Sequence, residues 1–76
     1  MNKKKRELLG AANDMLSKAA SIVEDVLDDE RDGFDNLPEG LQESENGEKM
    51  EAAIDAMESA IDSIKEASEY ISEAQS

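Results

Sequence analysis

Two long segments of this chain carry apolar residues in the alternating four-and-three spacing of a heptad, and this feature limits the fold more than any other. In the first segment the apolar positions are Leu8, Ala12, Met15, Ala19, Ile22 and Val26. In the second they are Met50, Ile54, Met57, Ile61, Ile64 and Ile71. This spacing places the side chains of each segment on one face of an α-helix. The sequence therefore predicts an all-α protein with helices over residues 4–31 and 45–74.

The segment between them, residues 32–44, contains the residues that interrupt helices: Gly33, Pro38 and Gly40. It is expected to be an ordered connector with one helical turn started by Pro38. Its apolar residues are predicted to plug the end of the helix pair, and they are Phe34, Leu37 and Leu41. Ser44 is a suitable N-cap for the second helix.

Folding the two helices back on each other gives one antiparallel hairpin spanning residues 1–76. A simple register results when the numbers of facing residues add up to 76, as with Val26 and Met50 or Ile22 and Ile54. Small residues of the first helix then face large ones of the second, which keeps the layers even. An alanine column in the second helix favours close packing of the backbones, at Ala53, Ala60, Ala67 and Ala74.

A further apolar stripe on the first helix has no cover in that register: Leu9, Leu16, Ala20, Val23 and Leu27. Its expected neighbours are charged, and a stripe of this kind is typical of an oligomer interface or a docking face. A single seam between two helices also buries little apolar surface. We therefore expect a homo-oligomer, in its simplest form a dimer that makes a four-helix bundle, with a partner helix as the alternative.

The charge of the chain is unevenly distributed. Of the eight basic residues, four form the run Lys3–Arg6, so the remaining 70 residues hold four basic and twenty acidic ones, a net charge of −16. Such a surface repels nucleic acids and anionic membranes and attracts basic proteins. The basic run is expected to balance the nearby Glu69 and Glu73. No signal peptide or membrane-spanning segment is recognisable, so a cytoplasmic protein is expected.

Acidic residues cover the outer face of the second predicted helix, at Asp55, Asp62, Glu66, Glu69 and Glu73. A face of this kind commonly serves solubility. Regularly spaced carboxylates also resemble a phosphate backbone, which would direct this face to the basic groove of a nucleic-acid-binding protein. The sequence leaves both interpretations open.

The residues needed for most enzyme chemistry are missing, because the chain has neither cysteine nor histidine. We expect no enzyme activity and no cofactor. Four acidic residues and a glycine do match positions one, three, five, six and twelve of a calcium-binding loop, at Asp28, Glu30, Asp32, Gly33 and Glu39. Glutamate at position three and Asp35 at a normally apolar position make this the weaker alternative.

The connector carries the run Asp35-Asn36-Leu37-Pro38-Glu39, followed by Leu41-Gln42 and Ser44-Glu45. Over residues 24–74 the chain resembles small acidic helical-hairpin proteins of Gram-positive phages and mobile elements. This resemblance implies a phage-type accessory protein that binds and modulates or inhibits a host protein, with a defence system as one candidate target. The alternative is a self-assembling scaffold or adaptor.

Overall fold

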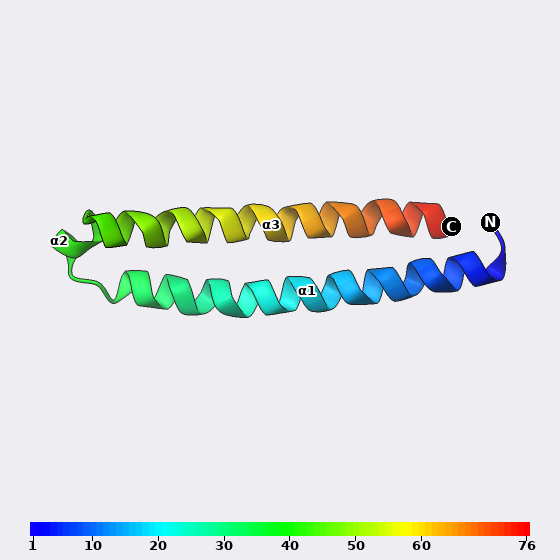
Figure 1. Cartoon of the computed structure of the whole chain (residues 1–76), viewed down its shortest axis with the longest axis horizontal. Helices are drawn as coiled ribbons and strands as arrows, with labels where there is room; N and C mark the ends of the chain where they lie inside the picture. The colour runs from blue at the N-terminus through cyan, green and yellow to red at the C-terminus, as the bar shows by residue number, and fades with distance from the viewer.

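The computed structural model of the protein describes all 76 residues and contains three helices. Helix α1 spans Lys3–Asp35, α2 spans Glu39–Gln42 and α3 spans Glu45–Gln75. The two long helices lie side by side and antiparallel, with α2 at the turn and both termini at the opposite end (Figure 1). The molecule measures 58 × 15 × 13 Å. The predicted all-α helical hairpin is confirmed.

Side chains at the helix starts satisfy backbone N–H groups that have no partner within the helix. The Asn2 side chain accepts a hydrogen bond from the Lys5 N–H at 2.8 Å. Ser44, the predicted N-cap of the second long helix, accepts one from the Gly47 N–H at 3.2 Å. Glu45 and Glu48 lie in the first turn of α3, where the positive end of the helix dipole stabilises their negative charge.

Helix α1 continues four residues beyond the predicted end at residue 31. Gly33 lies inside it with ordinary negative φ, so it does not break the helix. The reason is packing: Phe34 lies seven residues after Leu27 and contacts the same apolar core. A Cβ atom at Gly33 would lie 3.3 Å from Met50 Cε, so glycine allows α3 to approach here.

The connector is short and held by hydrogen bonds. Pro38 precedes α2, which confirms the predicted single turn. The Gln42 side-chain amide donates to the carbonyl oxygens of Phe34 at 3.2 Å and Leu37 at 3.4 Å. Of the predicted plug, Phe34 packs on the core and Leu37 is half-buried, but Leu41 is 52% exposed. Leu41 is therefore not part of a plug, because α2 turns it outward.

The core of the hairpin lies toward the connector end. Leu27, Ile54 and Ile61 are its buried residues, and Val23, Phe34 and Met57 pack against them. The predicted positions on α3 are thus confirmed as the seam. On α1 the prediction was wrong: Leu8, Met15, Ile22 and Val26 are between 50% and 70% exposed. The seam of α1 runs instead through Leu9, Leu16, Ala20, Val23 and Leu27, which are buried or half-buried.

The register differs from the predicted one by more than one helical turn. Ser68 on α3 donates to Asn13 on α1, and Arg31 donates to Glu58, so facing residue numbers add up to 81 and 89 rather than 76. Asn13 also donates to Ser72 Oγ at 3.1 Å and to Gln75 Oε1 at 3.4 Å. Near the termini the seam therefore contains a polar cluster around Asn13 in addition to its apolar residues. Polar contacts of this kind fix the register of paired helices.

Candidate binding surfaces

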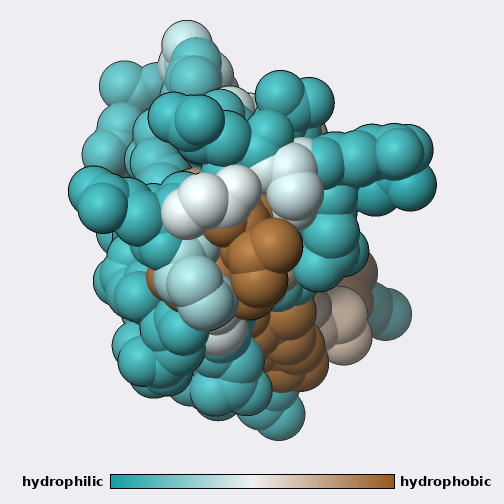
Figure 2. Space-filling model, turned by 90° about the vertical axis from the view of Figure 1, so that its left-hand side faces the viewer, coloured by the Kyte–Doolittle hydropathy of each residue, from teal (hydrophilic) through white to brown (hydrophobic).

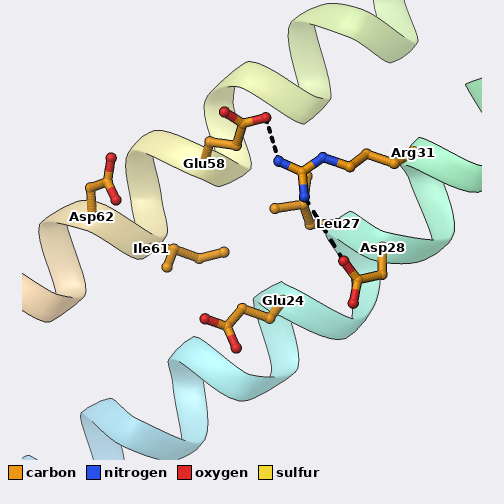
Figure 3. Close-up of a pocket in the computed structure, with 7 residues that line it drawn as sticks. All are labelled: Glu24, Leu27, Asp28, Arg31, Glu58, Ile61 and Asp62. Atoms are coloured by element: carbon orange, nitrogen blue, oxygen red, sulfur yellow. Dashed lines mark hydrogen bonds and ion pairs between the residues drawn. The ribbon is translucent and has the colours of Figure 1, made fainter.

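Three surfaces of the hairpin are candidates for binding: a groove between the long helices, the acidic face of α3, and an exposed apolar stripe on α1. The groove is shallow and open, with a volume of about 430 Å³. Leu27 and Ile61 lie along it, and charged side chains surround them: Glu24, Asp28, Arg31, Glu58 and Asp62 (Figure 3).

The only cation in this groove is already engaged. The Arg31 guanidinium lies 2.7 Å from Glu58 Oε1 across the hairpin and 3.9 Å from Asp28 Oδ1 within α1 (Figure 3). Farther along the same side, Lys65 Nζ lies 3.7 Å from Glu24 Oε1. Each ion pair is partly exposed and contributes at most about 1 kcal/mol. The groove therefore holds the two helices in register, and it contains no paired base and nucleophile.

The acidic face of α3 is open to solvent. All five predicted residues are exposed: Asp55, Asp62, Glu66, Glu69 and Glu73. None of the five makes an ion pair, because the one lysine among them, Lys65, pairs with Glu24 of α1. Four of them also line a second shallow groove of about 450 Å³ that includes Tyr70. The structure thus places the predicted residues on one negative surface, in which Lys65 is the one basic neighbour and none of the five carboxylates is ion-paired.

The α1 residues predicted to form a partner interface pack inside the hairpin instead. Leu27 is 4% exposed inside the hairpin, and Leu9, Leu16, Ala20 and Val23 are half-buried along the same seam. These residues pack on α3 because the register places apolar residues of α3, rather than charged ones, opposite them. The hairpin leaves uncovered the α1 residues that were predicted to form the seam. Each of them precedes a residue of the observed seam by one position along the chain. We call Leu8, Ala12, Met15, Ala19, Ile22 and Val26 the outer stripe.

The outer stripe is strongly exposed. Its four large residues are Leu8 at 62%, Met15 at 70%, Ile22 at 64% and Val26 at 50%. Ala12 and Ala19 are half-buried between them. Figure 2 views the molecule from the connector end and shows hydrophobic atoms in the centre and toward one side, with hydrophilic atoms around the rest. A contiguous exposed stripe of large apolar residues is typical of an interaction surface.

Two further predictions concern charged residues near the helix ends. Residues 28–35 belong to α1, so the calcium-like motif forms a helix and not a loop. No group of three or more acidic residues is placed to hold a metal ion. The basic run Lys3–Arg6 was expected to balance Glu69 and Glu73, but its one ion pair is local, from Lys3 Nζ to Glu7 Oε1 at 4.0 Å. Lys4, Lys5 and Arg6 make no ion pair.

Comparison of the chain with protein-family models, with curated proteins and with solved structures finds no match. None of the helices combines the length and the apolar character that crossing a membrane requires. The architecture therefore defines the class: an extended, antiparallel helical hairpin with an acidic face and an exposed apolar stripe.

Proposed function

We propose that this chain is a non-enzymatic accessory protein that binds a basic surface of a host protein through the acidic face of α3 and thereby modulates or inhibits it. The observation that carries the proposal is that the carboxylates of this face are exposed and have no ion-pair partner within the chain. Its five carboxylates are exposed, and no lysine or arginine of the chain pairs with any of them. The chain leaves these charges free for a partner.

The spacing of the carboxylates favours a partner that normally binds nucleic acid. Asp62, Glu66, Glu69 and Glu73 follow one another at intervals of four, three and four residues. At 1.5 Å per residue they span about 16.5 Å, or about 5.5 Å between neighbouring charges. One strand of DNA carries a phosphate every 3.4 Å or so along its axis, so the carboxylates form a sparser row of the same charge, which a basic groove shaped for DNA attracts. The phage-type resemblance of the connector supports a host protein as the target.

A second candidate function is self-assembly as a scaffold or adaptor. The outer stripe on α1 favours it, because the stripe is apolar and therefore suits a salt-independent contact. The two functions use different helices, so they are separable by substitutions on α3 and on α1.

The proposal is tested by removing charge from α3 without changing the helix. In the triple variant Asp62→Asn, Glu66→Gln, Glu69→Gln, three carboxylates become neutral amides of similar shape. The matched control is Asp14→Asn, Asp25→Asn, Asp32→Asn, which makes the same change in net charge at exposed positions of α1. Circular dichroism checks that both variants keep the helicity of the parent.

Proteins retained from a bacterial lysate at 0.1 M NaCl are then eluted with rising salt and rebound to each variant. We expect the α3 variant to lose the bound protein and the α1 control to keep it. Binding by the parent should weaken steeply with salt, since exposed charges are screened beyond about 8–10 Å at moderate ionic strength. Equal retention by all three proteins would rule out the acidic face as the binding surface.

A further inference from the structure

The hairpin has two broad faces, one on each side of the seam between α1 and α3. The order of residues along α1 shows that one face carries the cross-helix ion pairs and the other the outer stripe. The buried seam of α1 includes Leu16 and Val23. Each residue is rotated by about 100° around the helix axis from the one before it. Glu24, one position after a seam residue, therefore points to one side of the seam. Met15 and Ile22, one position before seam residues, point to the other side. Glu24 forms the cross-helix ion pair with Lys65. The outer stripe therefore lies on the face of α1 opposite the ion pairs.

Helix α3 repeats this division on the same two faces. Glu58 and Lys65 follow seam residues by one position and make the ion pairs to α1. Residues that precede the seam by one position, among them Ala56 and Ser63, lie on the opposite face. That is the face of the outer stripe. The hairpin thus has one ion-paired face and one face that combines the outer stripe with small side chains of α3.

The exposed area of the hairpin is large enough for one further contact of standard size. A folded monomer of 8.3 kDa typically exposes about 4,600 Å². The hairpin exposes 5574 Å² because it is only two helices thick. The excess is about 1,000 Å², slightly more than the roughly 800 Å² that each partner loses in a standard protein interface. One extra contact of standard size would bring the chain to the exposure of an ordinary folded protein.

The charges on α1 favour a second copy of this chain as the partner on this face. The helix begins with the basic run Lys3–Arg6 and ends in the acidic segment 28–35, with no acidic residue in its first turn and no basic residue in its last. Both ends oppose the helix dipole, which favours negative charge at the start and positive charge at the end. A neighbouring helix of the reverse polarity would compensate both ends at once, and an antiparallel copy of α1 has that polarity.

We propose that two copies of this chain pair through α1, antiparallel and related by a two-fold axis that crosses the outer stripe between Met15 and Ala19. Facing residues of the two copies then have numbers that add up to 34. The pairs are Leu8 with Val26, Ala12 with Ile22, and Met15 with Ala19. Each alanine faces a larger side chain, which fills the layers evenly. The next positions outward pair Lys5 with Asp29, neither of which has an ion-pair partner within the hairpin.

This pairing is self-complementary, as a two-fold interface requires. Lys4, Lys5 and Arg6 of each copy meet residues 28–30 of the other, which are all acidic, so opposite charges face each other at both ends. Lys3 faces Arg31, which already pairs with Glu58 within the hairpin. A parallel pairing would place the two basic runs together and the two acidic segments together. The apolar centre supplies affinity, and the charges select the antiparallel orientation. The inference is independent of the proposed binding through α3, whose acidic residues stay outside the contact.

The first test compares Met15→Glu with the matched control Ser17→Glu by light scattering. Both add one carboxylate at nearly the same height on α1, but Met15 lies on the outer stripe and Ser17 on the opposite face. The parent and Ser17→Glu should have a molar mass of about 17 kDa, twice 8.3 kDa. Met15→Glu should fall to 8.3 kDa with its helicity retained. A parent of 8.3 kDa at 100 µM would overturn the proposal, as would a dimer that Met15→Glu leaves intact.

The second test fixes the orientation by disulfide formation, which is clean because the chain has no cysteine. In the variant Ala12→Cys, Ile22→Cys the two sites of one chain are about 15 Å apart along α1, too far to bridge. Antiparallel pairing should instead give covalent dimers under mild oxidation, and Ser17→Cys should give none. A dimer that forms no Ala12→Cys, Ile22→Cys cross-link would contradict the α1–α1 arrangement. Cross-linking of Ile22→Cys, Ser63→Cys between chains would show that α1 packs on α3 of the second copy.

Discussion

Replacement of Gly47 by alanine tests the corner where the connector enters α3. Gly47 is buried and lies in the first turn of the helix, where the Ser44 hydroxyl accepts a hydrogen bond from its N–H. A Cβ atom here would lie 2.6 Å from the Leu41 carbonyl oxygen and closer still to that of Gln42. These are backbone atoms, which cannot turn away as a side chain would. The close approach explains why this position needs glycine although the residue is a poor helix former.

The expected change in stability is the sum of three effects, of which the first stabilises the protein and the other two destabilise it. Alanine in place of glycine favours the helix by about 1 kcal/mol. Forcing a methyl group against two carbonyl groups costs about 1–3 kcal/mol through displaced backbone. Displacement of the first turn also weakens the Ser44 cap, which contributes about 1 kcal/mol. Gly47→Ala should therefore destabilise the protein by about 1–3 kcal/mol, equivalent to at least about 4 °C in Tm for a domain of this size.

The control is Gly40→Ala in α2, where a Cβ atom would meet nothing within 4 Å. This change should leave the stability unchanged or raise it by up to about 1 kcal/mol, because alanine restricts the unfolded chain. Thermal unfolding followed by circular dichroism at one fixed protein concentration measures both variants. If Gly47→Ala unfolds at or above the Tm of Gly40→Ala, the close approach of α2 to the start of α3 is refuted.

The other predictions concern the seam and the cap, and urea unfolding at fixed protein concentration measures each of them. Leu27→Ala should cost about 2–5 kcal/mol because it empties a core position that is 4% exposed. Leu41→Ala, at an exposed position, should change the stability by no more than about 0.5 kcal/mol, and equal losses for the two would place the core elsewhere. Asn13→Ala should cost about 0.5–1.5 kcal/mol through loss of its hydrogen bonds to α3, and a neutral result would remove Asn13 from the seam. Ser44→Ala should cost about 0.5–2 kcal/mol and Ser44→Gly a few tenths, and the reverse order would contradict the cap.

The helical hairpin and its main boundaries were predictable because they depend on local signals. Heptad spacing defines the two helices, and Ser44 and Pro38 carry out the capping and turn roles that their chemistry favours. The end of α1 was not predictable from Gly33 alone. Glycine interrupts a helix only where nothing holds it, and here the contact of Phe34 with the core extends the helix past it.

The seam of α1 was mistaken because two heptad columns one residue apart run along the same helix. Apolar content does not distinguish them, since both contain large aliphatic residues. The polar residues do distinguish them: Asn13 belongs to the column that contains Leu9 and Leu16, and α3 offers partners for it at Ser68 and Ser72. Matching polar positions between the two helices, in addition to apolar ones, would have favoured the observed register.

The presence of two adjacent apolar columns on one helix has a physical meaning of its own. A helix that packs on one neighbour needs one column, and a helix at the corner of a four-helix bundle needs two columns about 90–100° apart. In this chain α1 has both, and the hairpin itself uses only one. The acidic face of α3 was predicted as a group because its residues share a helical face regardless of register.

The central claim is that the α1 column containing Leu27 packs on α3 and that the outer stripe faces away from α3. Methyl–methyl nuclear Overhauser effects test it directly, in a sample labelled at leucine, isoleucine and valine. Within one molecule, Leu27 methyl groups should show strong effects to Ile54 and Ile61, and Ile22 should show none to Ile54. Intramolecular effects from Ile22 to Ile54, with none from Leu27 to Ile61, would contradict the account.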